Sequence, residues 1–353
     1  MYSCIKHVTI KGLSACVPKQ VVKTMDYDWI SEDERKLFIK STGVEERRMS
    51  PESIITSDYC QKATEELLSK LNWDKESVDV LIFVSQSMDY YLPATSAILQ
   101  HKLGFKKETI AFDINLGCSG YNYGLYVISN LISSGNLKRG ILLTGDTSTI
   151  SSNYKDKSTY PLFGDAGTAT AIEFDETASD MYFNLFTDGS GYKSIIVEDG
   201  GARNKFSEKS FIDHKISEGI ERSAKNLVLD GIEVFNFALK EVAASINKLL
   251  ADSNTNLLNV DYFVFHQANK LINESVRKKC RIEPERVPYS IDKFGNTSSA
   301  SIPLTMLYKL RDELENKSLN LLLSGFGVGY SWGNCIVRTN KIICTDIIEI
   351  DEI

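Results

Sequence analysis

The chain has few of the features that mark membrane, secreted or zinc-binding proteins. No apolar run approaches the 18 or so residues of a membrane span, and the opening residues alternate like a strand rather than a signal peptide. The seven cysteines are odd in number, widely spaced and without a CxxC pair, which argues against a disulfide framework or a zinc site. We therefore expect a soluble cytoplasmic protein with no metal.

Basic sequence is also scarce. The formal net charge is −7 and no long run of lysine or arginine occurs, which argues against a general nucleic-acid binder. With 353 residues, of which 42% are hydrophobic and 25% charged, the composition is that of a globular protein with a sizeable core. The length suggests about two domains or one large duplicated unit.

The two halves of the chain repeat one order of landmarks at a spacing of about 180 residues. These landmarks are a buried strand that opens with Val-Asp, a glycine before a helix start, and an aliphatic strand that ends in a hydroxyl residue and glycine. The matched positions are 78–79 and 260–261, 117 and 295, and 141–145 and 321–325. The repeat predicts a duplicated α/β unit of βαβαβ order, with halves at residues 1–175 and 176–353.

Hydrophobic periodicity and turn residues predict the individual elements. Continuous apolarity at 78–84 and 260–266 predicts strands covered on both faces, as in a parallel sheet between helix layers. The other expected strands are 111–116, 139–145, 168–174, 321–325 and 335–338. The expected helices are 26–40, 57–71, 95–103, 121–134, 217–229, 231–250, 268–279 and about 296–314.

Cys118 is the cysteine whose position indicates chemistry. It lies in a Gly-Cys-Ser-Gly turn between an apolar run and the helical segment Tyr121 to Ser134. At a helix N-terminus, unpaired backbone N–H groups and the helix dipole favour a thiolate, the form in which cysteine is a nucleophile. The commoner alternative is a small buried cysteine that only fills space.

Two further residues occupy matching positions in the second half. His266, one of only four histidines, follows the buried strand Tyr262 to Phe265, and Asn296 follows Gly295 at a helix start. Ligands collect at the carboxyl ends of parallel strands and at the N-termini of the helices that follow, so we expect one pocket for all three residues. A hydrogen-bonded core histidine and an N-cap asparagine are the alternatives.

Four motifs in order carry a resemblance to a known family. They are Asn-Leu-Gly-Cys-Ser-Gly at 115–120, Val-Phe-His-Gln-Ala-Asn at 264–269, Phe-Gly-Asn-Thr-Ser-Ser at 294–299 and Gly-Phe-Gly-Val-Gly-Tyr-Ser-Trp-Gly at 325–333. Together they make the chain similar to β-ketoacyl-acyl carrier protein synthase III, of the thiolase superfamily, from about residue 5 to residue 338. The resemblance implies a thiolase-like fold, in which the two halves pack as a layered α/β/α/β/α sandwich.

The resemblance also implies a reaction. Cys118 would take an acyl group from a thioester, and a malonyl thioester would then lose carbon dioxide and attack that acyl group, giving a β-ketoacyl thioester for fatty acid or specialised acyl biosynthesis. His266 and Asn296 would donate hydrogen bonds to the malonyl thioester carbonyl, and the backbone N–H groups of Cys118 and Val328 would form the oxyanion hole. No cofactor is implied, since thioesters of coenzyme A or phosphopantetheine are the substrates.

Further implied features concern the acyl group and its carrier. Leu92 and Phe326 would line the acyl pocket, with the Leu92 loop reaching across the interface of a homodimer. Family members that load acyl-coenzyme A often carry tryptophan and arginine where this chain has Leu37 and Ser41. The primer is therefore expected as acyl-coenzyme A or as acyl-acyl carrier protein, and these residues leave the choice open.

An acyl carrier protein is acidic, so its docking site should be basic. The expected docking residues are Lys270, Arg277, Lys278, Lys279 and Arg281, on and just after the helix that follows His266. Stabilisation of the helix C-terminus by these cations is the alternative reading.

Other activities on the same fold stay open from the sequence. An acyltransferase that passes the acyl group to an oxygen or nitrogen nucleophile would need no decarboxylation, and a non-catalytic subunit would need no intact site. A degradative thiolase needs a second cysteine near the final glycine turn, and Cys335 lies beyond it on the closing strand. Elongating synthases use two histidines, so Asn296 argues against them.

Overall fold

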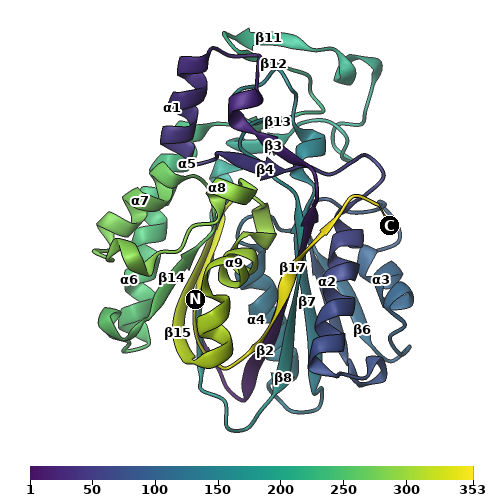
Figure 1. The fold of residues 1–353 in the computed structure, drawn as a ribbon, viewed down its shortest axis with the longest axis vertical. Coiled ribbons are helices and arrows are strands. Elements are labelled where there is room, and N and C mark those ends of the chain that lie inside the picture. Colours follow the sequence, from purple (N-terminus) through teal and green to yellow (C-terminus); the bar gives the residue numbers. More distant parts are fainter. Residues whose placement is uncertain (353) are drawn as a thin grey trace.

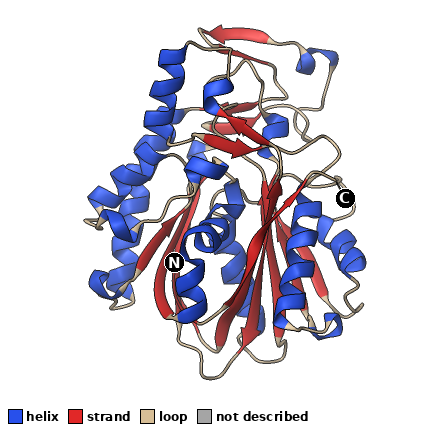
Figure 2. Cartoon of the chain, viewed as in Figure 1, coloured by secondary structure: helices blue, strands red, loops and turns tan. Residues whose placement is uncertain are grey.

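The computed structural model describes residues 1–352 and contains two large mixed β-sheets with helices between and outside them (Figures 1 and 2). The six-stranded sheet runs β17 (Ile343–Ile350), β2 (Val8–Pro18), β8 (Ala166–Phe174), β7 (Arg139–Asp146), β5 (Val80–Val84), β6 (Ile110–Ile114). The five-stranded sheet runs β1 (Tyr2–Ile5), β9 (Met181–Thr187), β16 (Ser331–Asn340), β15 (Ser318–Gly327), β14 (Tyr262–Phe265).

Three hydrophobic clusters define the layers. The central cluster joins helices α4 and α9 to both sheets, a second packs α2 and α3 on the six-stranded sheet, and a third packs α5 to α7 on the five-stranded sheet. The helices are α1 (Glu32–Thr42), α2 (Thr56–Leu71), α3 (Thr95–Leu103), α4 (Gly120–Ile132), α5 (Gly231–Phe237), α6 (Ala243–Asp252), α7 (Lys270–Lys279), α8 (Ile291–Phe294) and α9 (Ser301–Asn316). This order confirms the predicted α/β/α/β/α sandwich.

The continuous apolar runs form the strands that they predicted. Every residue of β5 is buried, and β5 pairs in parallel with both β6 and β7. In the second sheet β14 pairs in parallel with β15. Because parallel strands end at the same edge of a sheet, the loops after β5, β6 and β7 share one end of the molecule.

The two terminal strands each pair in the sheet of the other half. β1 joins β9 in the five-stranded sheet, and β17 joins β2 in the six-stranded sheet. The division at residue 175 stays a prediction, but each sheet contains one strand from beyond that boundary.

Two predicted helices differ in the structure. Residues 217–229 are not helical: β11 (His214–Ser217) and β12 (Ile220–Arg222) form a hairpin, and β13 (Leu227–Leu229) pairs with β10 (Ile195–Val197). Gly219 turns this hairpin with a φ of 71°, a conformation that favours glycine and ends a helix. Helix α1 begins at Glu32 rather than Asp26, because Ser31 and Glu34 form a capping box.

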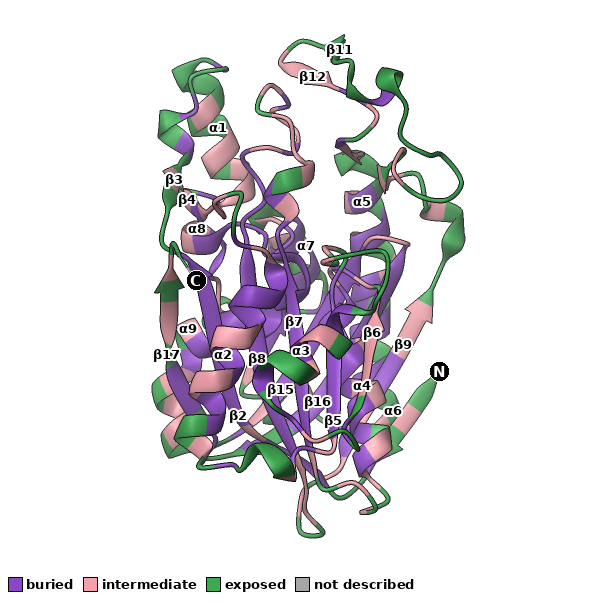
Figure 3. Ribbon diagram, turned by 90° about the vertical axis from the view of Figure 1, so that its right-hand side faces the viewer, coloured by how far each residue is buried: buried purple, intermediate pink, exposed green. Residues whose placement is uncertain are grey.

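The upper part of the molecule in Figure 1 is built from short elements, including the two-stranded sheet of β3 (Val21–Lys23) and β4 (Glu46–Arg48). Burial is concentrated in the two large sheets and the helices between them, whereas β11 and the long loop beside it are mostly exposed (Figure 3). Among residues 1–352, no helix has both the length and the apolar character that crossing a membrane requires.

Candidate active site

Cys118 lies in the tight turn between β6 and α4. The turn is closed by a hydrogen bond of 2.6 Å from the Gly120 N–H to the Gly117 carbonyl, and α4 begins at Gly120. The end of β15 lies directly against the cysteine, since a Cβ added at Gly327 would be 2.7 Å from the Cys118 Sγ. Glycine at 327 therefore leaves room for the sulfur, and Cys118 remains partly exposed.

The surroundings of Cys118 favour the neutral thiol over the thiolate. Burial raises the pKa of Cys118 to about 11, and the negative charge of Asp146 adds to the rise. Hydrogen bonds from the N–H groups of Val328 and Cys118 itself and from the Ser298 hydroxyl oppose this shift but do not cancel it. Desolvation therefore opposes the stabilisation of a thiolate that the helix start provides, and a thiolate at Cys118 stays a prediction.

His266 follows β14 and is only 1% exposed. Its backbone N–H continues the strand ladder to the Ser324 carbonyl at 2.8 Å, and its Nδ1 lies 2.7 Å from the Ser301 Oγ. The ring also packs edge-on against Phe326, with 5.7 Å between ring centroids. Burial lowers the pKa of His266 to about 3, so the imidazole is neutral at physiological pH.

Asn296 is held by both halves of the chain. Its N–H donates to the Leu162 carbonyl at 2.9 Å, and its carbonyl accepts from the Gly164 N–H at 3.0 Å. The side-chain Oδ1 accepts from the Ser298 N–H at 2.9 Å, whereas Nδ2 has only a long 3.5 Å contact with the Ala268 carbonyl. The amide is therefore oriented by its oxygen, which leaves its N–H₂ free to donate to a bound molecule.

Ser298 brings the three predicted residues together. Its hydroxyl interacts with the Cys118 sulfur, its carbonyl with the His266 ring and its N–H with the Asn296 amide. It adopts a φ of 49°, which is uncommon for a residue with a side chain. Ser298 lies inside a quoted sequence motif, but its role depends on a backbone conformation that the motif alone does not reveal.

Comparison with known proteins agrees with this geometry. Models of 3-oxoacyl-[acyl-carrier-protein (ACP)] synthase III match residues 112–189 and, for its C-terminal part, residues 250–339. β-Ketoacyl-[acyl-carrier-protein] synthase III of Streptococcus mutans is 32% identical over 325 residues, covering 91% of this chain and 96% of its own. The β-ketoacyl-[acyl-carrier-protein] synthase III of Clostridioides difficile is 30% identical over 329 residues, which cover 93% of this chain and 97% of that protein. The chain belongs to the synthase III family.

A solved structure supports the assignment. The 3-oxoacyl-(acyl-carrier protein) synthase of Burkholderia xenovorans has a TM-score of 0.93 and 37% identity, covering 99% of each chain. The chain is therefore an enzyme, an acyltransferase of the synthase III family with the thiolase-like fold.

Two of the synthase III pocket residues predicted from the sequence differ sharply in burial. Phe326 is fully buried beside His266, whereas Leu92 is 86% exposed on the loop after β5. A role for Leu92 in lining an acyl pocket stays a prediction, and it requires a second chain to receive the loop.

The predicted docking cations lie on and after α7, but one of them is buried. Arg277 is 9% exposed, and its guanidinium donates to the Glu274 carboxylate and to the Ile282 carbonyl. Arg277 therefore stabilises the end of α7, and its assignment to the docking surface is wrong. The exposed cations are Lys270, Lys278, Lys279 and Arg281.

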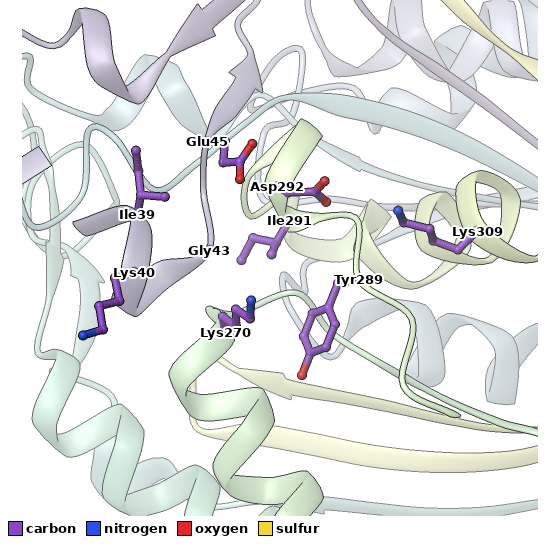
Figure 4. A pocket seen from close by; sticks show the side chains of 9 residues that line it. All are labelled: Ile39, Lys40, Gly43, Glu45, Lys270, Tyr289, Ile291, Asp292 and Lys309. Atoms are coloured by element: carbon purple, nitrogen blue, oxygen red, sulfur yellow. The ribbon is translucent and has the colours of Figure 1, made fainter. Parts of the chain in front are cut away.

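A cavity of about 590 Å³ lies between the end of α1 and the start of α7 (Figure 4). Its lining includes Lys40, Lys270, Lys309, Glu45 and Asp292, so cations and carboxylates face the same space. Cys118, His266 and Asn296 are not part of its lining.

Proposed function

We propose that the enzyme catalyses a decarboxylative Claisen condensation of an acyl thioester with a malonyl thioester. The observation that carries the proposal is the convergence of Cys118, His266 and Asn296 on Ser298, in a chain of the synthase III family. The products are a β-ketoacyl thioester, carbon dioxide and the free thiol of the carrier that delivered the acyl group, and Cys118 is regenerated.

In the first half-reaction the Cys118 sulfur attacks the acyl thioester carbonyl. The carbonyl oxygen becomes an oxyanion, and the N–H groups of Cys118 and Val328 are placed beside the sulfur to receive it. The carrier leaves as a thiolate and takes up the proton that the Cys118 thiol has lost. The acyl group is then held on the enzyme, which divides one difficult reaction into two easier steps.

In the second half-reaction the malonyl thioester loses carbon dioxide, and its carbonyl oxygen becomes an enolate. The Asn296 N–H₂ and a neutral His266 can both donate to that oxygen without being charged themselves. The resulting carbanion attacks the acyl carbon and releases the Cys118 thiolate, which takes up a proton from solvent. A histidine with a pKa of about 3 remains in this neutral form throughout the physiological range.

The partners follow from this chemistry. We propose malonyl-acyl carrier protein as the extender, docking on the exposed cations Lys270, Lys278, Lys279 and Arg281, and a homodimer that works in the cytoplasm without a cofactor. The primer is an acyl-coenzyme A or an acyl-acyl carrier protein. Leu37 is 64% exposed on α1.

Mass spectrometry of Cys118 tests the proposal directly. After incubation with a panel of acyl-coenzyme A and acyl-carrier-protein thioesters, the wild type should gain the mass of one acyl group on Cys118, and Cys118→Ala should gain none. Undiminished labelling of that variant would contradict the assignment. Release of carbon dioxide from the malonyl thioester separates condensation from acyl transfer to an oxygen or nitrogen nucleophile, which needs no decarboxylation.

A further inference from the structure

A buried aspartate, Asp146, lies next to the segment that contacts the three catalytic residues. Asp146 ends β7 and is 2% exposed. Its Oδ1 accepts from the Gln86 N–H at 2.7 Å and from the Ser85 hydroxyl at 3.1 Å, and its Oδ2 accepts from the Ser299 hydroxyl at 3.0 Å. The Ser299 N–H is 3.4 Å from the same Oδ2.

The hydrogen bonds that Asp146 accepts favour its carboxylate form. One fixed backbone N–H donor faces each oxygen, an arrangement that stabilises a carboxylate more than a carboxylic acid. None of the donors that the structure gives to Asp146 is a cation, and burial alone raises its pKa. An unpaired buried charge is costly, which indicates a reason for its position other than stability.

Asp146 links the two halves of the site. On one side Asp146 holds the 85–87 loop through the Gln86 N–H. The Gln86 side chain lies against Gly117, because a Cβ added at Gly117 would be 2.5 Å from the Gln86 Oε1. On the other side it holds Ser299, next to Ser298, which contacts Cys118, His266 and Asn296. The same carboxylate therefore anchors the neighbours of the nucleophile and the segment that orients the two donors.

We propose that Asp146 is a positioning residue that ties the Cys118 turn to the Ser298–Ser299 segment and keeps a negative charge beside the thiol. The catalytic consequence rests on the proposed function, whereas the effect on the thiol does not. Asp146, from the end of β7, carries the charge that raises the pKa of the Cys118 thiol, and His266, from the end of β14, shares Ser298 with Cys118 and is neutral. Asp146 is thus the charge that acts on the sulfur.

Alkylation of Cys118 by iodoacetamide tests whether Asp146 is charged beside the thiol. Mass spectrometry across a range of pH gives the pH midpoint of alkylation. Asp146→Asn should lower the pH midpoint of alkylation by about one unit, because a negative charge near the thiol disfavours the thiolate. Asp165→Asn is the matched control: Asp165 is another fully buried carboxylate, bound to Ser50 and Thr149, and its removal should leave the midpoint unchanged. Loss of structure would also expose the thiol and lower the midpoint, so the shift counts only if the circular dichroism spectrum and melting temperature of Asp146→Asn match those of the wild type.

A second variant tests the tether. Ser299→Ala removes one donor and keeps the carboxylate, so the alkylation midpoint and the acylation of Cys118 should stay as in the wild type, while condensation falls at least about tenfold. An unchanged midpoint in folded Asp146→Asn overturns the inference, as does full condensation by Ser299→Ala. If Asp146→Asn does not fold, Ser299→Ala decides alone. A wild type without condensing activity would refute the proposed function, yet the midpoints would still test the inference.

Discussion

Cys118 combines a raised thiol pKa with hydrogen-bond donors placed for negative charge. Below its pKa the thiolate fraction of a cysteine rises tenfold for each pH unit, so with a pKa of about 11 Cys118 should alkylate about ten times faster at pH 9 than at pH 8. Because His266 has a pKa of about 3, the profile should show no second inflection between pH 5 and pH 9. Rates of iodoacetamide labelling measure this, and a plateau by pH 8 would contradict it.

We expect the Ser301 hydroxyl to decide which nitrogen of His266 donates. Its hydroxyl lies 2.7 Å from Nδ1, and if it donates there the ring proton is on Nε2, where a bound carbonyl would compete with the Ser298 carbonyl for it. Ser301→Ala should lower malonyl decarboxylation about tenfold, the loss of roughly 1.4 kcal/mol that one hydrogen bond supplies. Ser301→Thr keeps the hydroxyl and should retain most of the activity. Equal turnover of the alanine variant and the wild type would remove Ser301 from this role.

The sequence predicted which residues form the candidate site better than it predicted their contacts and burial. Cys118, His266 and Asn296 stand in motifs with a recognisable order, and their types alone suggest nucleophile and donors. The role of Ser298 could not be predicted, because it depends on a left-handed φ and on which of its atoms face each neighbour. Arg277 was misassigned because a charge in a sequence does not reveal burial, although Glu274 three residues earlier was a visible partner.

At the scale of elements, the position of Asn296 depends on the close contact between the segment around Gly164 and the end of α8. The segment around Gly164 passes so close to the end of α8 that a Cβ added at Gly164 would collide with the Phe294 carbonyl oxygen. Gly164→Ala should therefore push the two backbones apart, at a cost of about 1–3 kcal/mol of stability, as overpacking typically does. It should also displace Asn296 and lower turnover about a hundredfold, because a shift of about 1 Å in a catalytic group can cost that much.

Thermal unfolding and condensation assays check this prediction. Gly189→Ala is the control, since a Cβ added there meets nothing within 4 Å. The control should match the wild type in both assays. Wild-type turnover of Gly164→Ala would show that Asn296 is not positioned by this crossing.

Elements were predictable where the local pattern decides the structure. The uninterrupted apolar run of β5 could only be buried on both faces, and it is. The segment 217–229 has mixed apolar and charged residues, and its fate was decided by the turn at Gly219 and by pairing with distant strands. Such pairing is not encoded in the segment itself.

At the scale of the whole molecule, the duplication was visible in the sequence but the exchange of terminal strands was not. The spacing of about 180 residues reveals the order of strands and helices that the two halves share. The placement of β1 and β17 depends instead on which sheet edge is open after the halves have packed. An unpaired edge can pair with any strand of suitable geometry, so the sequence of a terminal strand does not reveal which edge it will join.

The two edges of the six-stranded sheet differ in how they are protected. β17 forms one edge and carries Asp346 and Glu349, which pair with Arg311 and Arg48. β6 forms the other edge with the sequence Ile-Ala-Phe-Asp-Ile, and Ile110 on it is 42% exposed. Charged edges resist pairing and apolar edges invite it, so we expect the proposed homodimer to form along β6.

Charge placed on β6 should therefore dissociate the dimer. Ile110→Lys is expected to shift the mass measured by light scattering towards that of one chain, and condensation should fall with it, because the exposed Leu92 loop is predicted to complete the acyl pocket of the second chain. Ile343→Lys is the matched control, since Ile343 is 39% exposed on the opposite edge strand. If Ile110→Lys remains a dimer, the interface lies elsewhere, and if it becomes an active monomer, the site needs no second chain.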